Sequence, residues 1–227
     1  MKRKIIIALV LTLLDVGGML YLRRSPVTTT ALLKKTDVNE ISRANDEDNF
    51  KEVKADNEDC QRLLYLSDRT LPIVVSKDNK EYLAQNVQGN YDRMGTLFQA
   101  KEVKQNSQNI VIYGHSSTRN NKRLTPLKDK AYIQANSEFS VRDEDKATTY
   151  RIIAYLLVDI NEPPVAFYQA DWRTAGEFQN YLRTANSLSR LPFWLADTEE
   201  YASCLTLVTC DLRNKARRWV VVAIPVS

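Results

Sequence analysis

Short apolar runs separated by polar turn segments extend from about residue 63 to the end of the chain. They limit its possible folds more than any other feature. Six runs are rich in Val, Ile, Leu and aromatic residues: residues 71–75, 95–98, 110–113, 150–158, 204–209 and 219–224. Runs of this length and composition predict β-strands, and the longest is typical of a buried strand. Such a series with turn signals between its members predicts a mainly β domain, either a barrel or a sandwich.

One segment between the strand-like runs predicts a helix instead. Thr174 and Glu177 have the spacing of a capping box, in which each side chain accepts a hydrogen bond from a backbone N–H at the helix start. The residues that follow repeat at helical spacing and form one apolar face: Phe178, Tyr181, Leu182, Ala185 and Leu188. The Leu191–Pro192 step predicts the end of this helix, because proline disfavours a helical conformation in the residue before it.

Composition places the chain among ordinary globular proteins. Its 227 residues suffice for one substantial core, with 44% hydrophobic and 26% charged residues. The net charge of +4 is mild and no long basic block is present, so nucleic-acid binding is not indicated. The chain also lacks a phosphate-binding glycine loop and a dinucleotide-binding fingerprint.

The amino terminus has the pattern of a membrane segment. Residues 1–4 carry a positive cluster, and residues 5–22 form an apolar run near the lower length limit of a spanning helix. Residues 21–24 do not form a small-residue cleavage site, so we expect a retained signal anchor over residues 1–24. Residues 25–59 are polar and predict a stalk with one or two amphipathic helices, and residues 60–227 predict the globular domain.

Three residues at the ends of strand-like runs have the chemistry of thiol acyl transfer. Cys210 closes the run 204–209, His115 follows the run 110–113, and Arg218 opens the run 219–224. A thiolate is a strong nucleophile, an imidazole can exchange protons, and a guanidinium can stabilise an oxyanion. His115 is the single histidine of the chain, so any imidazole role must belong to it. The alternatives are a buried apolar cysteine, a hydrogen-bonded core histidine and a solvated arginine.

These motifs resemble those of a known family. The segments YGHS at 113–116, LTLVTC at 205–210 and RWVVV at 218–222, in this order, resemble the sortases, the cysteine transpeptidases of Gram-positive bacterial surfaces. The details are most similar to class B, and the resemblance covers about residues 60–227. It implies a closed β-barrel with peripheral helices, including a long helix before the strand of the catalytic cysteine. It also implies a single-pass protein of the cell membrane with its catalytic domain on the extracellular face.

The resemblance implies the role of each catalytic residue. Cys210 would be the nucleophile, and His115 would protonate the leaving amine. The family's arginine stands one position before the hydrophobic run, which selects Arg218. Strand alternation places its neighbour Arg217 on the opposite face. Arg218 would then stabilise the acyl oxyanion or hold the substrate backbone.

Four further residues are expected to bind the substrate peptide. Phe167 and Tyr168 precede the predicted helix, where class B enzymes bind a sorting peptide; the alternative is that these aromatic rings pack on the core. Thr209 and Asp211 flank the nucleophile, and Asp211 is expected to contact substrate or Arg218 because a neighbouring carboxylate opposes thiolate formation. Val208 departs from the class B pattern, where serine is frequent.

The implied function is transpeptidation. The enzyme would cleave the carboxy-terminal sorting signal of a secreted surface protein and pass its acyl group to an amine of a peptidoglycan precursor, without a metal or organic cofactor. Three alternatives remain open: a pilus-polymerising sortase that uses a pilin lysine, a cysteine protease in which water resolves the acyl enzyme, and a non-catalytic domain that binds sorting peptides. In the papain-type proteases the cysteine precedes the histidine, which is the reverse of the order found here.

The two other cysteines leave a choice that the sequence does not settle. In an exported domain Cys60 and Cys204 can form one disulfide, leaving one free thiol, or both can remain unpaired apolar residues. The spacing of His115 and the three cysteines matches no common zinc motif, so a structural zinc site is not predicted.

Overall fold

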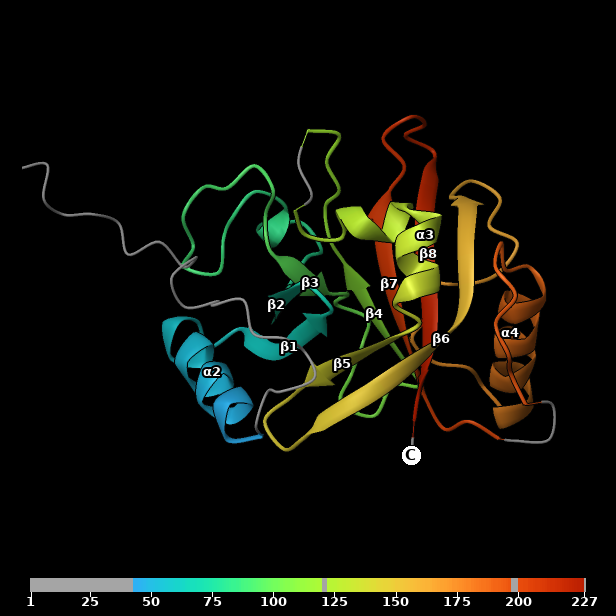
Figure 1. The fold of residues 1–227 in the computed structure, drawn as a ribbon, viewed down its shortest axis with the longest axis horizontal. Helices are drawn as coiled ribbons and strands as arrows, with labels where there is room; N and C mark the ends of the chain where they lie inside the picture. The colour runs from blue at the N-terminus through green and yellow to red at the C-terminus, as the bar shows by residue number, and fades with distance from the viewer. Residues whose placement is uncertain (1–42, 120–121, 197–199, 227) are drawn as a thin grey trace, which may run out of the picture. The chain divides into compact units, whose positions relative to one another are not determined.

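Eight strands close into a barrel in the order β1-β2-β3-β4-β7-β8-β6-β5 (Figure 1). The structure, a computed structural model, describes residues 43–119, 122–196 and 200–226. The strands are β1 (Cys60–Leu66), β2 (Arg69–Val75), β3 (Leu97–Gln99), β4 (Asn109–Tyr113), β5 (Glu138–Arg142), β6 (Ala147–Asp159), β7 (Cys204–Cys210) and β8 (Arg217–Pro225). The predicted mainly β fold and closed barrel are confirmed, and all six apolar runs overlap strands.

Helices lie around this barrel. They are α2 (Arg43–Asp56), α3 (Lys130–Ala135) and α4 (Ala175–Ser187), with two 3₁₀ turns, η2 (Glu81–Leu83) and η3 (Thr125–Lys128). Helix α2 lies in the segment where the sequence predicts helices, and its Phe50 is buried against strand residues that include Leu63 of β1. Strands β1 and β5 were not among the six predicted runs. Polar residues such as Gln61 and Arg62 interrupt the apolar pattern of β1, and β5 alternates polar and buried residues.

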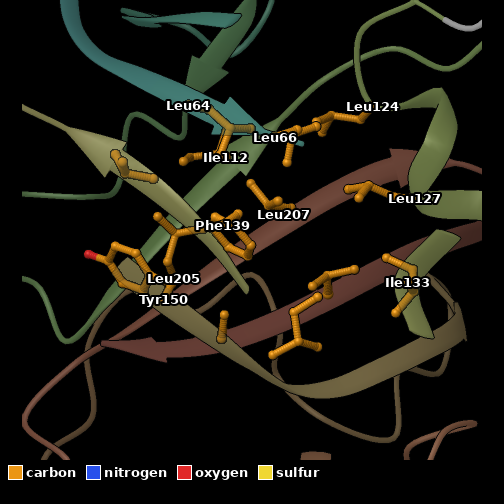
Figure 2. Close-up of a cluster of buried hydrophobic side chains, with 14 of the residues drawn as sticks. Leu64, Leu66, Ile112, Leu124, Leu127, Ile133, Phe139, Tyr150, Leu205 and Leu207 are labelled. Atoms are coloured by element: carbon orange, nitrogen blue, oxygen red, sulfur yellow. The ribbon is translucent and has the colours of Figure 1, made fainter. Parts of the chain in front are cut away.

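The barrel interior holds one cluster of side chains from strands distant in sequence. Figure 2 shows Leu205 and Leu207 of β7 beside Phe139 of β5 and Tyr150 of β6. At one end of the cluster Ile133 of α3 is packed with leucines of the η3 region. Alternate residues of β7 therefore fill the barrel, which leaves Val208 and Cys210 on its outer face.

A second apolar cluster covers the outside of β6, β7 and β8. Helix α4 buries Phe178, Tyr181, Leu182 and Ala185 in it, which confirms four positions of the predicted apolar face. The fifth, Leu188, is exposed because it is the C-cap residue, just beyond the helix. These strands are covered on both faces, which explains their nearly continuous apolar sequences. The predicted helix start is confirmed, because the Thr174 hydroxyl accepts a hydrogen bond from the Glu177 N–H at 3.1 Å. The Glu177 carboxylate in turn accepts from the N–H of Arg173 at 3.1 Å.

The predicted single-pass membrane location needs correction. Across residues 43–119, 122–196 and 200–226, no helix combines the length and apolar character needed to cross a bilayer. The apolar run at residues 5–22, on which that prediction depended, lies outside the described residues.

Candidate active site

Parallel pairing of β4 with β7 brings the predicted histidine and cysteine to one edge of the barrel. In the register of these strands Tyr113 lies opposite Val208. Because the strands run in the same direction, the residues that follow Tyr113 and Val208 leave the sheet together. His115 and Cys210 each lie two positions beyond this pair, so the barrel places them near one another although they are distant in sequence.

Three hydrogen bonds hold the chain around His115 to the end of β7. The Gly114 N–H donates to the Val208 carbonyl at 3.1 Å, and the Thr209 hydroxyl donates to the Gly114 carbonyl at 2.7 Å. The Ser116 hydroxyl donates to the Cys210 carbonyl at 2.8 Å. Backbone and short side chains make all three bonds, so the relative position of the two segments does not depend on flexible groups.

Antiparallel pairing of β7 with β8 adds the arginine. Cys210 lies opposite Arg218 in the register, so both side chains stand on the outer face of the barrel wall. The Arg218 guanidinium donates to the carbonyls of Lys215 and Arg217, each at 2.8 Å. Arg217 lies on the other face, opposite Asp159 of β6, and is exposed. The structure thus separates the two adjacent arginines as strand alternation predicts.

A cavity of about 270 Å³ joins the three side chains. His115, Cys210 and Arg218 all line it, together with Gly114, Val208 and Thr209. Four lining residues had not been singled out from the sequence: Asn79, Leu83, Phe98 and Tyr113. Asn79 and Leu83 precede β3, in a segment without a recognisable motif. Tyr113 adjoins the Gly-His pair and was the one of the four that the sequence pattern could have indicated.

One hydrogen bond and one phenol with a raised pKa give the cavity its polar character. The His115 Nε2 lies 2.8 Å from the carbonyl oxygen of Leu83 in η2. Burial raises the pKa of the Tyr113 phenol, and the Glu102 carboxylate adds to the rise while the Arg218 charge opposes it. The phenol therefore remains protonated at neutral pH and can donate a hydrogen bond to a ligand.

The residues predicted to bind substrate lie in different environments. Phe167 is only 3% exposed and belongs to the outer apolar cluster, whereas Tyr168 is 51% exposed and its ring contacts Phe167 edge-on. Thr209 lines the cavity, but its hydroxyl is bonded to the Gly114 carbonyl. The Asp211 carboxylate accepts from the N–H of Arg213 at 3.1 Å, and the Asp211 N–H donates to the Arg217 carbonyl at 3.1 Å.

The three cysteines are free, so Cys60 and Cys204 do not form a disulfide. Cys60 and Cys204 belong to separate apolar clusters, and their strands, β1 and β7, are not neighbours in the barrel. Burial raises the pKa of Cys60 to about 11 and also raises the pKa of Cys204. Cys210 is partly exposed, which makes it the thiol that a substrate can reach. No group of three His, Cys, Asp or Glu residues that could hold a metal occurs in the part of the chain that the structure describes.

The fold is shared with known proteins. The Sortase domain family model matches residues 67–226. Sortase B from Clostridium perfringens is 25% identical to this chain, with a TM-score of 0.69 over 78% of this chain and 99% of that one. A mutant form of that protein is 24% identical, with a TM-score of 0.70 over 81% of this chain and 89% of its own.

A Staphylococcus aureus sortase B–substrate complex is also similar. It is 18% identical to this chain, with a TM-score of 0.68, and the match covers 80% of this chain and 86% of that one. No curated protein sequence matches the chain significantly.

Proposed function

Because the chain belongs to the sortase family, a family of cysteine transpeptidases, we propose that it is a class B sortase. Its substrate is the carboxy-terminal sorting signal of a secreted protein, and its acceptor is an amine of the cell wall. The observation that carries the proposal is the meeting of Cys210, His115 and Arg218 around one cavity. The overall likeness to sortase B from Clostridium perfringens supports the class assignment.

The first chemical step forms a thioester. The Cys210 thiolate attacks the carbonyl carbon of the scissile peptide bond, a C–S bond forms, and negative charge develops on the carbonyl oxygen. In the Arg218 guanidinium, Nη1 binds the carbonyls of Lys215 and Arg217. The N–H groups on its other nitrogens stabilise this oxyanion. The C–N bond then breaks, and His115 donates a proton to the leaving amine.

The second step returns the enzyme to its starting state. The acceptor amine attacks the thioester carbon, a C–N bond forms, and the C–S bond breaks to release the Cys210 thiolate. The nitrogen loses a proton to His115, which had given one up in the first step. One imidazole therefore serves as acid and then as base, which agrees with the presence of a single histidine in the chain.

The peptide is proposed to lie in the cavity between the loop before β3 and the ends of β4, β7 and β8. Tyr168, which is exposed and acts electrostatically on Tyr113, extends this surface. Thr209 is proposed to contact the peptide mainly through its backbone, because its hydroxyl is already bonded. Phe167 supports Tyr168 from below, and Asp211 shapes the turn that carries Arg218.

The choice of acceptor provides the test. A library of sorting-type peptides is incubated with the full chain and increasing concentrations of peptidoglycan-type amines or a pilin-type lysine peptide, and acid and amide products are quantified by mass spectrometry. A transpeptidase yields amide product that increases with amine concentration, and the preferred amine separates wall anchoring from pilus polymerisation. Exclusively acid product with every amine supports a protease, and binding without any product supports a peptide-binding domain. Cys210→Ala is the matched control for uncatalysed reaction.

A further inference from the structure

The contact between His115 and Leu83 determines which ring nitrogen carries a proton. A backbone carbonyl can only accept hydrogen bonds, so Nε2 must donate its proton across the 2.8 Å contact to the Leu83 oxygen. This holds for the neutral ring and for the imidazolium, since both can keep a proton on Nε2. The nitrogen that gains and loses a proton is therefore Nδ1.

The segment 91–96 fixes the carbonyl that makes this contact. The Thr96 N–H donates to the Tyr82 carbonyl at 3.0 Å, and the Asp92 N–H donates to the Ala84 carbonyl at 3.0 Å. The Thr96 hydroxyl donates to the Gln85 carbonyl at 2.9 Å. The carbonyls on both sides of Leu83 are thus bound by one neighbouring segment, and the Leu83 carbonyl between them is directed to His115.

Gly95 allows the segment 91–96 to pack closely against the backbone of Tyr82 and Leu83. Its φ is +57°, and a Cβ atom at this position would lie 2.3 Å from the Tyr82 oxygen and 2.8 Å from the Leu83 oxygen. Real Cβ atoms do not approach oxygen so closely, and both oxygens are backbone atoms, so the turn itself would have to shift. Any side chain at position 95 would therefore displace the carbonyl that binds His115.

The same loop contains a natural comparison. Gly89 also has a positive φ, +76°, but an added Cβ would meet nothing within 4 Å. Alanine at either glycine carries the cost of the left-handed backbone conformation, and only at position 95 does it also collide with the turn.

An ion pair connects the segment 91–96 to the segment that follows His115. The Arg123 guanidinium lies 2.9 Å from the Asp92 carboxylate, and the Leu124 N–H donates to the carbonyl of His115 at 3.1 Å. The loop of Asp92 is therefore linked through Arg123 and Leu124 to the backbone of His115. These links limit how far His115 and Leu83 can separate.

We propose that the Leu83 carbonyl and Gly95 form a positioning unit that keeps His115 in the Nε2–H tautomer, so that Nδ1 carries the proton transfers of the reaction. Gly95 acts through the turn and does not touch the substrate. The role of Nδ1 in catalysis rests on the proposed transpeptidase function, whereas the tautomer itself does not.

The test uses the single histidine of the chain. Selective ¹⁵N labelling of histidine gives one pair of ring nitrogen signals, and their chemical shifts and couplings to ring protons identify the tautomer of the neutral ring. The wild-type full chain should show a protonated Nε2 and an unprotonated Nδ1. Gly95→Ala should lose this preference, and Gly89→Ala should keep it. A wild-type ring protonated at Nδ1, or a preference that survives in a folded Gly95→Ala protein, overturns the proposal.

Kinetics give the second readout. Gly95→Ala should lower kcat by about 100-fold, the scale of general acid–base catalysis, with little change in KM for the peptide. Gly89→Ala should retain wild-type values. Should Gly95→Ala not fold, the wild-type spectrum still decides the tautomer. The predicted tautomer in a protein without transpeptidase activity contradicts the proposed function alone, whereas an active enzyme with the other tautomer contradicts the positioning unit alone.

Discussion

At the scale of single residues, burial separates the three cysteines by reactivity. Burial raises the pKa of Cys60 to about 11 and also raises the pKa of Cys204, while Cys210 lines an accessible cavity. We expect iodoacetamide near neutral pH to modify Cys210 alone in the native protein and to abolish activity, because the thiolate is the reactive form. Peptide mapping by mass spectrometry locates the label.

The matched variants make this labelling experiment decisive. Native Cys210→Ala should take up no label and form no product, whereas Cys60→Ala should still take up one label and remain active. All three thiols of the wild-type chain should react after unfolding in denaturant. Labelling of Cys60 or Cys204 in the native wild type, or product formation by Cys210→Ala, would contradict the assignment of the nucleophile.

Two adjacent arginines differ in the face of β8 that they occupy. Arg218 lies opposite Cys210 and lines the cavity, whereas Arg217 lies opposite Asp159. We expect Arg218→Lys to lower kcat/KM by about 100-fold or more, the cost of losing an oxyanion donor, because an ammonium lacks the planar set of N–H groups. Arg217→Lys serves as the control and should retain activity. Steady-state kinetics with a sorting-type peptide measure both, and the reverse ranking would shift the site by one residue.

At the scale of elements, Asn109 of β4 joins the barrel to the loop that carries Tyr168. Its buried amide donates to the carbonyls of Phe167 at 3.3 Å and Gln169 at 2.8 Å. Its Oδ1 accepts from the Thr206 hydroxyl at 2.8 Å and from the Cys204 thiol at 3.3 Å. One side chain therefore connects β4, β7 and the loop before α4.

We expect Asn109→Ala to lower the free energy of unfolding by about 3 kcal/mol, since it removes the side-chain donor to the Phe167 and Gln169 carbonyls and the acceptor of the Thr206 hydroxyl. It should also raise KM for the peptide more than it lowers kcat, because the loop with Tyr168 loses two of the hydrogen bonds that hold it to β4. Thr206→Val removes one bond to Asn109 and leaves both loop bonds, so its KM should stay near that of the wild type. Urea unfolding and peptide kinetics measure the two effects, and equal KM values for both variants would contradict the role of the loop.

At the scale of the whole molecule, several buried acidic protons predict alkaline instability. Burial raises the pKa of Cys60 to about 11 and that of Tyr82 to about 12, and it also raises the pKa values of Cys204, Tyr155 and Tyr181. Each group keeps its proton in the folded state at pH values where the unfolded chain has lost it. Its stabilisation is therefore complete below the unfolded pKa and is lost as pH rises toward the folded pKa.

We accordingly expect the free energy of unfolding to fall as pH rises from about 9 to about 11, the window set by the cysteine and tyrosine protons. Tyr82→Phe lacks one of these protons, so its stability should depend less steeply on pH between about 10 and about 12. Urea titrations at a series of pH values measure both slopes. A stability that stays constant or increases over this range would contradict the direction of these pKa shifts.

The sequence by itself determined the features that are local in the chain. The apolar runs that became β6, β7 and β8 are continuous because these strands are covered on both faces, and the cap at Thr174 depends on residues within one helical turn. The order of the motifs around His115, Cys210 and Arg218 could likewise be read directly, because each residue stands at the end of such a run.

Only the tertiary structure decided what depends on pairing between distant segments. Barrel rather than sandwich follows from the contact of β1 with β5. The apolar run of β1 and the alternating pattern of β5 are both short, and neither indicates which strand it pairs with. The parallel register of β4 and β7 and the contact of His115 with the Leu83 carbonyl connect segments far apart in the chain. Every residue has a backbone carbonyl, so no sequence pattern distinguishes the Leu83 carbonyl that binds His115. This carbonyl has its role because long-range packing places it beside the histidine ring.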